Sequence, residues 1–308
     1  MSMPADPLVS VVLPTYNRAR LLPRSIGSVL AQGYPNLELI VADDCSTDDT
    51  EAVVRSFADP RVRYLRCPRN GGPGYARNRG IEVARGDFIA FQDSDDEWLT
   101  DKLDRQVALL QKSPPEVGMV CGAYVVWLGD DRLDNHPLSA SAERGDFEPD
   151  LLYGFRYTPP TWLLRRECLL TTGPFDESLP NREDWDLMFR VMPRWRLRGV
   201  HEPVIVQYRT ADSVDKNFKA RVSSYTTLLE RYEARWAGAP KLKAHQWYEL
   251  SRAQRSLNQY REARGSLRRA LSVRPFWIKA MAAWVVSLFG QRWFYAAQRL
   301  YQKIARVR

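Results

Sequence analysis

The chain has 308 residues, of which 44% are hydrophobic and 27% charged, a globular composition that excludes wholesale disorder, collagen and a coiled-coil fibre. A chain of about 300 residues buries roughly three quarters of its unfolded surface, so its core needs no disulfide or metal to be stable. The net charge of +8 is unevenly distributed: residues 216–308 contain 20 Lys and Arg against 4 Asp and Glu, and the preceding residues are acidic overall.

The cysteines and the N-terminal residues indicate the cellular compartment. The four cysteines include no Cys-x-x-Cys pair, which argues against a zinc knuckle or redox motif and is typical of a reducing compartment; each is expected in the core. Residues 1–7 contain Asp6 and two prolines where an export signal needs basic and apolar residues. In the C-terminal part, the longest uncharged run, Ala280–Gln291, is shorter than the ~18 residues of a transmembrane helix. The sequence therefore predicts a cytoplasmic protein that does not cross the membrane.

Short apolar runs alternate with helical periodicities from residue 8 to residue 92. Strands are expected at Leu8–Leu13, Leu37–Ala42, Val62–Leu65 and Asp87–Gln92. Helices are expected between them over Leu21–Leu30, over Asp48–Phe57 with Ser46 or Thr47 as N-cap, and over Tyr75–Ala84. This alternation predicts an α/β fold with an open, mostly parallel sheet flanked by helices.

The pattern changes twice further along the chain. From Val117 to about Tyr208 it is mixed, with expected strands at Met119–Trp127, Thr161–Arg165 and Pro203–Tyr208, a helix at Glu183–Met192, and loops at Gly129–Pro137 and Ser141–Pro149. Beyond Asp215 the helical spacing of apolar residues continues alone. Breaks near Gly238, Gly265, Pro275 and Gly290 predict three to five C-terminal helices.

Polar clusters follow three of the predicted strands at the point where each strand ends. They are Pro14-Thr15-Tyr16-Asn17, Asp43-Asp44 and Gln92-Asp93-Ser94-Asp95-Asp96. Because the carboxyl ends of parallel strands meet at one edge of a sheet, we expect all three clusters to lie together there.

The Asp93-x-Asp95 cluster brings together carboxylates that would repel one another without a cation. Mg²⁺ or Mn²⁺ removes that repulsion, and such ions usually complete their shell with substrate phosphates. Taken alone, the cluster is more typical of an acidic turn that caps a helix starting near Trp98. Asp43-Asp44 likewise fits either a turn or the recognition of nucleobase and ribose groups.

A glycine-rich segment, Asn70–Gly80, is expected to form a loop that opens a helix, with Arg77 able to bind a phosphate. The segment lacks the Gly-x-Gly-x-x-Gly spacing of a dinucleotide fold and the Gly-Lys-Ser/Thr ending of a P-loop. Both of these nucleotide-binding folds therefore lose their main support.

Taken together, the clusters resemble glycosyltransferase family 2, the inverting enzymes with the GT-A fold. The matching motifs are Val-Val-Leu-Pro14-Thr-Tyr16-Asn17, Asp43-Asp44-Cys-Ser46-Thr47-Asp48, Asn70 with Gly71-Gly72, Ala76-Arg77-Asn78-Arg-Gly80, Asp93-Ser-Asp95-Asp96-Glu-Trp98 and Glu183-Asp184-Trp185. They follow the family's order and spacing over about Leu8–Ser213. The resemblance implies a catalytic GT-A domain over residues 1–215, with a donor half at about 8–112 and an acceptor half at about 117–215. Residues 216–308 would form a basic helical extension.

Position by position, the resemblance also implies a donor site, a metal site and a catalytic base. The donor-binding residues would be Pro14, Thr15, Tyr16, Asn17, Asp43, Asp44, Arg77, Asp93 and Ser94. Asp44, more than Asp43, would bond the base, Arg77 would help to fix the nucleotide, and Asp93 with Asp95 would hold the ribose and a Mn²⁺ or Mg²⁺ ion. Asp184 would deprotonate the acceptor hydroxyl, with Glu183 as the second candidate. The alternative reading of Glu183-Asp184 is a helix N-terminus that favours acidic residues.

One departure from the family concerns the metal. Many relatives have a histidine in a late Tyr-Arg-x-His motif, whereas this chain reads Tyr208-Arg209-Thr210-Ala211. The third metal contact is therefore open, and His201, just before the last strand, is a substitute candidate.

The expected function is the transfer of one sugar from a nucleotide-diphosphate sugar, a UDP-sugar by family habit, to an acceptor hydroxyl in cell-surface or lipid-linked glycan synthesis. The alternative is a catalytically inactive nucleotide-sugar-binding or membrane scaffold protein, which the presence of Asp93, Asp95 and Asp184 disfavours. A nicotinamide oxidoreductase is set aside because Pro14–Asn17 occupies the place of its glycine fingerprint.

The basic extension has two competing interpretations. It either packs on the catalytic domain with a solvated basic face, or it meets an anionic membrane on the inner face, where aromatic rings and basic groups both favour the headgroup zone. Aromatic residues among the arginines support the second; they are Trp277, Trp284, Phe289, Trp293, Phe294 and Tyr295. No nucleic-acid partner is expected.

Overall fold

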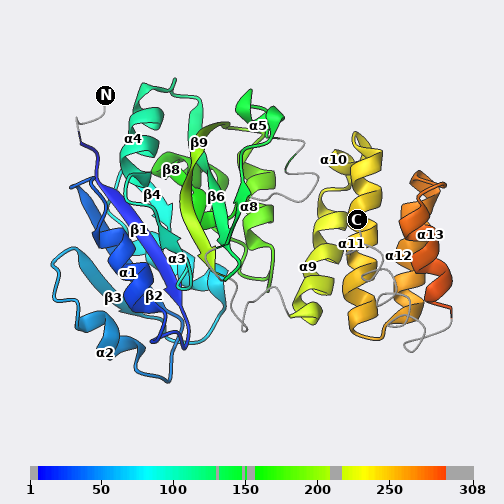
Figure 1. Ribbon diagram of the computed structural model, residues 1–308, viewed down its shortest axis with the longest axis horizontal. Helices are drawn as coiled ribbons and strands as arrows, with labels where there is room; N and C mark the ends of the chain where they lie inside the picture. Colours follow the sequence, from blue (N-terminus) through cyan, green and yellow to red (C-terminus); the bar gives the residue numbers. More distant parts are fainter. Residues whose placement is uncertain (1–5, 130–131, 148–149, 151–156, 209–216, 289–308) are drawn as a thin grey trace. The chain divides into compact units, whose positions relative to one another are not determined.

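A mixed sheet forms the centre of the first of two compact units (Figure 1). The computed structural model describes residues 6–129, 132–147, 150, 157–208 and 217–288. The strands within these residues are β1 (Val9–Thr15), β2 (Leu37–Asp43), β3 (Val62–Arg66), β4 (Phe88–Phe91), β5 (Glu97–Trp98), β6 (Val117–Trp127), β7 (Leu133–His136), β8 (Leu163–Arg165) and β9 (Arg196–Tyr208). Their order in the sheet is β3-β2-β1-β4-β8-β6-β9-β5, and β7 pairs with β6.

The first four strands of the chain pair in parallel. β1 lies between β2 and β4, and β2 also pairs with β3. The later strands are mixed: β8 is antiparallel to β4 and β6, β5 is antiparallel to β9, and β6 and β9 are parallel. The predicted parallel sheet over residues 8–92 is confirmed, and so is the mixed pattern beyond it.

Helices flank the sheet of the first unit. They are α1 (Leu22–Leu30), α2 (Thr50–Arg55), α3 (Pro73–Val83), α4 (Lys102–Lys112), α5 (Ala140–Glu143), α7 (Arg166–Thr172) and α8 (Glu183–Val191), with a 3₁₀ turn, η1, at Pro159–Thr161. Every residue of β1 is buried, because helices cover both faces of this central strand. Val11 packs in one cluster with residues of α1 and α4, whereas Val12 faces α3. A Cβ at Gly80 would lie 2.4 Å from Val12 Cγ1, so this glycine allows α3 to approach the strand.

Two local predictions in the donor half are wrong. Helix α2 begins at Thr50 with Asp49 at the N-cap position, and the Oγ of Ser46 instead accepts a hydrogen bond from the backbone N–H of Asn17. Trp98 lies in the short strand β5, and the next helix begins only at Lys102. In both cases a partner distant in the sequence determines the local structure.

The two expected loops of the acceptor half contain regular structure. Residues 133–136 of the first form β7, which pairs with β6, and α5 covers the start of the second. Neither segment has the apolar periodicity that would reveal an element, because β7 is mostly exposed and α5 has only four residues.

The second unit is helical. It contains α9 (Phe218–Arg231), α10 (Glu233–Ala237), α11 (Pro240–Ser256), α12 (Tyr260–Val273) and α13 (Ile278–Val286), together with the short segment Leu179–Arg182. The prediction of three to five C-terminal helices is confirmed for the described residues. The break expected near Gly265 is wrong, since that glycine lies inside α12 and the chain turns at Asn258 instead. Among the described residues, no helix combines the length and the apolar character that a membrane span requires.

A buried glutamate in β2 predicts a pH-dependent stability. Glu38 accepts hydrogen bonds from Ser10 Oγ (2.7 Å), Arg63 Nη1 (2.8 Å) and the backbone N–H of Arg85 (2.8 Å). Burial alone would raise its pKa, but these hydrogen bonds prevail and lower the pKa of Glu38 to about 2. Ionised Glu38 therefore stabilises the fold above the unfolded pKa, and this contribution is lost as the pH falls from about 4.5 towards 2.

We expect Glu38→Gln to lower the free energy of unfolding at pH 7 and to reduce the loss of stability between pH 5 and pH 3. Urea unfolding of both proteins at pH 7, 5 and 3 measures this. Equal pH dependence of the two proteins would show that Glu38 does not contribute.

Candidate active site

The three polar clusters meet at one edge of the sheet, as predicted. Thr15 and Asp43 are partners in the register of β1 and β2, and Val12 pairs with Phe91, the last residue of β4. The residues that follow β1, β2 and β4 therefore emerge side by side. This is the edge at which open parallel sheets bind their ligands.

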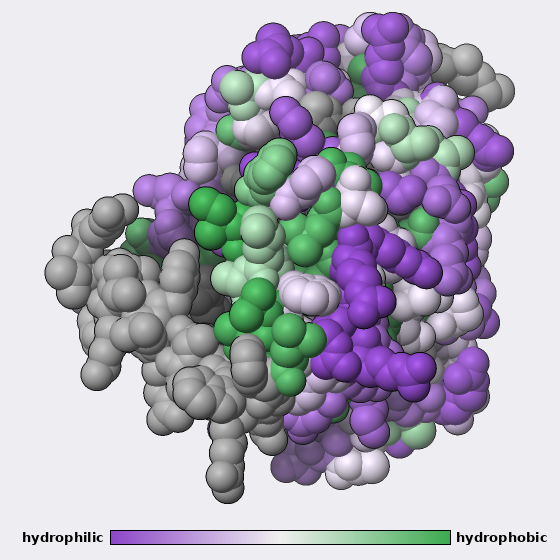
Figure 2. Space-filling model, turned by 90° about the vertical axis from the view of Figure 1, so that its right-hand side faces the viewer, coloured by the Kyte–Doolittle hydropathy of each residue, from purple (hydrophilic) through white to green (hydrophobic). Residues whose placement is uncertain are grey.

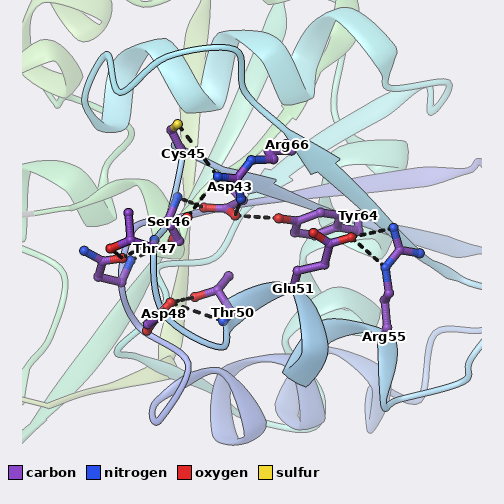
Figure 3. A network of polar contacts seen from close by, with 11 residues as sticks. Asp43, Cys45, Ser46, Thr47, Asp48, Thr50, Glu51, Arg55, Tyr64 and Arg66 are labelled. Atoms are coloured by element: carbon purple, nitrogen blue, oxygen red, sulfur yellow. Dashed lines mark hydrogen bonds and ion pairs between the residues drawn. The ribbon is translucent and has the colours of Figure 1, made fainter.

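Asp43 is engaged within the protein (Figure 3). Its Oδ1 accepts a hydrogen bond from the backbone N–H of Ser46 (2.9 Å), its Oδ2 accepts one from the Tyr64 hydroxyl (2.6 Å), and Arg66 lies 3.5 Å away. Burial and the bond to Asp43 raise the pKa of Tyr64 to about 12. Asp43 thus shapes the loop after β2, which leaves Asp44 as the better base-binding candidate.

Cys45, which lies between Asp44 and Ser46, is not fully buried. Cys67, Cys121 and Cys168 are buried, but Cys45 is only half-buried, with φ at 69° and Arg66 Nη2 at 3.9 Å from its Sγ. The expectation that it is a core residue is wrong, because the chain turns here to lead from β2 to α2 (Figure 3).

Asp44 ties the glycine-rich loop to the end of β2. Its Oδ1 accepts the backbone N–H of Gly71 (2.8 Å) and its Oδ2 that of Gly72 (2.7 Å). Burial raises the pKa of Asp44, and these two bonds oppose the shift. A carboxylate has about four acceptor positions, so Asp44 retains the capacity to accept a nucleobase N–H at this edge.

The segment after β1 provides one exposed ring. Pro14 and Thr15 are buried, whereas 45% of the Tyr16 side chain is exposed. Asn17 has φ at 51°, and its Oδ1 accepts a hydrogen bond from the backbone N–H of Thr47 (2.8 Å), which joins this segment to the loop after β2. Tyr16 is therefore the residue of this motif that is accessible for stacking on a base.

Arg77 connects the donor half of the domain to its acceptor half. Its Nη2 lies 2.8 Å from Asp93 Oδ1 and its Nη1 lies 2.6 Å from Glu183 Oε1. Only 6% of the Arg77 side chain and 9% of that of Glu183 are exposed. Burial alone would lower the pKa of Arg77, but Asp93 and Glu183 outweigh it and raise the pKa. The guanidinium thus binds two carboxylates, from the turn after β4 and from the first residue of α8.

Arg77 and its two partners, Asp93 and Glu183, form the Arg77 clamp. Replacing Arg77 is expected to lower the free energy of unfolding substantially. Arg77→Met leaves the buried carboxylate of Glu183 without its partner, and loss of one partner of a buried ion pair costs about 3–5 kcal/mol. Arg79→Met is the matched control: Arg79 lies on the same helix, is 33% exposed and pairs with Glu82 and Glu177, so its loss should cost about 1 kcal/mol or less. Urea unfolding compares the two, and equal costs would contradict the structural role of Arg77.

The Asp93–Asp96 turn is held by Arg24, which the sequence motifs do not include, and by Tyr208, the first residue of the late motif. Asp96 donates its backbone N–H to the Asp93 carbonyl oxygen (3.2 Å), and Arg24 Nη2 donates to the Asp95 carbonyl oxygen (2.5 Å). The Arg24 guanidinium also stacks 3.5 Å from the centre of the Tyr208 ring. Arg24, on α1, and Tyr208, at the end of β9, therefore fix the backbone of the predicted metal-binding turn.

The three aspartates of this turn differ in their surroundings. Asp96 is buried, accepts the Tyr208 backbone N–H (3.3 Å) and has its pKa raised first by burial and then by the charges of Asp93 and Asp95. Asp93 and Asp95 are half-buried, and Ser94 between them is buried. Asp96 is thus an anchor on β9, while Asp93 and Asp95 remain the accessible carboxylates.

Asp184 lies in the first turn of α8, directly after Glu183. It is half-buried, and its Oδ1 accepts the backbone N–H of Trp185 (2.8 Å). Its charge also contributes to the raised pKa of Arg77, which places it near the clamp. Glu183, by contrast, is committed to the ion pair with Arg77, so Asp184 is the better candidate for a base.

The structure does not bring His201 to these carboxylates. His201 is exposed on β9, with its Nδ1 3.8 Å from Glu143 Oε1 and seven residues before Tyr208. Val200 and Tyr208 pair with Gly122 and Trp127 of β6, which are five residues apart, so at about 3.3 Å per residue roughly 16 Å of strand separate the two positions. His201 therefore lies too far from the turn to bind the same ion, and Arg209–Ala211, where the sequence departs from the family, lie outside the described residues.

Two of the solved structures with a similar fold were determined with a nucleotide sugar bound. S. aureus TarS 1-349 in complex with UDP-GlcNAc matches with a TM-score of 0.60 at 20% identity, covering 91% of this chain and 79% of that chain. The mannosyltransferase PcManGT from Pyrobaculum calidifontis, in complex with GDP-Man and Mn²⁺, matches with a TM-score of 0.60 at 21% identity, covering 92% and 80%. The protein has the GT-A fold, and the chain also forms the C-terminal helices of the second unit.

The sequence comparisons define the family. Residues 10–171 match the model of glycosyl transferase family 2, and the chain belongs to that family. It is 32% identical over 197 residues to the putative colanic acid biosynthesis glycosyl transferase WcaA of Escherichia coli, covering 62% of this chain and 68% of WcaA. It is 40% identical over 121 residues to the Escherichia coli UDP-Glc:alpha-D-GlcNAc-diphosphoundecaprenol beta-1,3-glucosyltransferase WfgD, covering 39% and 47%.

Another relative is much longer than this chain. An uncharacterized protein of Sinorhizobium fredii is 35% identical over 207 residues, which are 66% of this chain and 22% of that protein.

Proposed function

We propose that the protein moves one sugar, with inversion, from a UDP-sugar to an acceptor hydroxyl in the synthesis of a cell-surface or lipid-linked glycan. The observation that carries this proposal is the Arg77 clamp, which joins Asp93 of the donor half to Glu183 of the acceptor half at 2.8 and 2.6 Å. The accessible carboxylates Asp95 and Asp184 are neighbours of these two residues in the chain. Inverting transfer needs such a site, because the leaving diphosphate and the attacking hydroxyl lie on opposite sides of one sugar.

The donor side of the proposed site fits a divalent cation. The described residues contain no cluster of three or more His, Cys, Asp and Glu side chains suited to a metal. Mn²⁺ and Mg²⁺ do not require one, since one or two carboxylates and the substrate phosphates often suffice. Asp93 and Asp95 would hold the ion, which when bound would neutralise charge on the leaving diphosphate. Asp44 would accept a base N–H, and Tyr16 would stack on the base.

On the acceptor side, Asp184 would act as general base. Its carboxylate would take the proton of the acceptor hydroxyl as that oxygen bonds to the anomeric carbon. The bond between this carbon and the diphosphate oxygen would break on the opposite face, so the configuration inverts. Arg77 would keep Glu183, and with it the first turn of α8, in place during the transfer.

The nucleotide and the acceptor are proposed from the relatives. TarS binds UDP-GlcNAc, WfgD is named for a UDP-Glc donor and a diphosphoundecaprenol acceptor, and WcaA is named for colanic acid biosynthesis. A lipid-linked acceptor would place the reaction at a membrane surface. We therefore propose that the protein works in the cytoplasm against the inner face of the membrane.

A donor screen tests this proposal. Thermal unfolding is measured with Mn²⁺ and, in turn, UDP-, GDP- and dTDP-sugars; a donor at 100 times its dissociation constant should stabilise the fold by about 2.7 kcal/mol. We expect a UDP-sugar to give this shift and EDTA to remove it. A shift with GDP-sugars alone would contradict the UDP assignment, and no shift with any nucleotide sugar would contradict the function.

A further inference from the structure

Helix α13 presents small residues to its neighbours. Ala280 and Ala283 are buried against Leu267 of α12, with Trp277 and Trp284 packed at the edge of this cluster. Ser287, just past the helix, is also buried, and its carbonyl oxygen accepts a hydrogen bond from Arg264 Nη1 (2.9 Å). The large apolar side chains of α13 therefore lie outside its contact with α12.

Those large side chains form an exposed apolar stripe. It consists of Ile278, Met281 and Val285 of α13, with Phe276 just before the helix and Leu288 just after it. Phe276 is 90% exposed and Ile278 79%, and the other three are between 45% and 51% exposed. Ile278, Met281 and Val285 are three and four residues apart, which places these side chains on one face of the helix. Figure 2 shows apolar residues gathered in the middle of this side of the molecule, with hydrophilic residues along the right-hand edge of the patch.

The chain segment that contains the stripe has an excess of positive charge. Between Ala263 and Leu288 the chain contains five basic residues and no acidic one. Four of the five are exposed: Arg268, Arg269, Arg274 and Lys279. An apolar stripe with a basic border is complementary to an anionic lipid surface, where acyl chains receive the apolar groups and headgroups receive the cations. A second copy of the same face would bring like charges together, which disfavours self-association.

We propose that the α13 stripe inserts into the interfacial layer of an anionic membrane, with the helix parallel to the bilayer plane. Its nine residues span about 14 Å, less than half of a ~30 Å hydrocarbon core, so this contact is peripheral. The proposal extends the proposed function, on which it rests for a lipid-linked acceptor, by assigning the membrane contact to particular residues. The evidence for the stripe itself does not depend on the reaction.

Vesicle co-sedimentation of the full chain tests the proposal. The vesicles contain phosphatidylcholine alone or with 30% phosphatidylglycerol, at 50 and 500 mM salt. We expect binding to the anionic vesicles at low salt, weaker binding at high salt, and at least tenfold weaker partitioning of the double variant Phe276→Ser/Ile278→Ser. The matched control is Leu170→Ser on α7, a residue 75% exposed outside the stripe, which should bind as the unmodified chain does.

The outcomes separate this proposal from its rivals. Equal binding by the double variant and the unmodified chain, or no binding by either, would overturn it. A dimer seen by light scattering that the double variant dissociates, without vesicle binding, would assign the stripe to a second copy and overturn it as well. The thermal shift with donor is measured on the same samples. Absence of this shift would count against the proposed function alone, because vesicle binding tests the stripe independently of the reaction.

Discussion

Asp184→Asn is expected to leave donor binding unchanged and to lower turnover by about 10²–10⁴-fold, the usual contribution of a positioned general base. The amide can still accept the backbone N–H of Trp185, so the first turn of α8 should keep its structure. It cannot take a proton from the acceptor hydroxyl. Calorimetry with the donor identified by thermal shift measures binding, and release of the nucleoside diphosphate in the presence of acceptor measures turnover.

Glu183→Gln is the informative comparison for Asp184→Asn. Glu183 is ion-paired with buried Arg77, so its neutral variant should lower the free energy of unfolding, whereas Asp184→Asn should not. Full stability with lost turnover in Glu183→Gln, together with an active Asp184→Asn enzyme, would make Glu183 the base. Loss of donor affinity in Asp184→Asn would make Asp184 a binding residue instead.

The position of the site could be predicted because its signals are local. A run of apolar residues that stops at Pro14, at Asp43 or at Gln92 marks a strand end, and parallel pairing then brings the following polar residues to one edge. No partner needs to be known for this step. The same reasoning predicts the alternation of strands and helices up to residue 92.

The contacts that organise the site could not be predicted in the same way. Arg77 and Glu183 are 106 residues apart, and Arg24 reaches Asp95 across 71 residues. Arg77 was expected to meet a phosphate because nothing in its own segment reveals two carboxylate partners. Arg24 gives no signal at all, since an arginine in the first turns of an amphipathic helix is ordinarily a surface residue.

His201 shows that residue type and position in the sequence do not by themselves identify a metal ligand. The sequence predicts a strand that starts at Pro203, and a histidine just before it would lie close enough to replace the missing motif residue. The observed strand β9 starts at Arg196, well before the predicted Pro203, and it carries His201 away from the Asp93–Asp96 turn. The length of β9, which depends on its parallel pairing with β6, therefore determines where His201 lies.

Asp95→Asn is expected to abolish metal-dependent donor binding. The substituted amide presents a neutral oxygen where a cation shared with two phosphates needs negative charge, and Asp93 is already paired with Arg77 through its Oδ1. Calorimetric titration of donor in the presence of Mn²⁺, repeated with EDTA, measures the metal-dependent part of the affinity.

Asp96→Asn is the matched control for Asp95→Asn, because it makes the same change one residue further along the turn. Asp96 faces β9 and accepts the backbone N–H of Tyr208, a bond that an asparagine oxygen can keep. The control should therefore retain metal-dependent binding that Asp95→Asn loses. Unchanged affinity in Asp95→Asn would remove Asp95 from the metal site, and equal losses in both variants would mean that the turn acts through its folded shape rather than through the charge of Asp95.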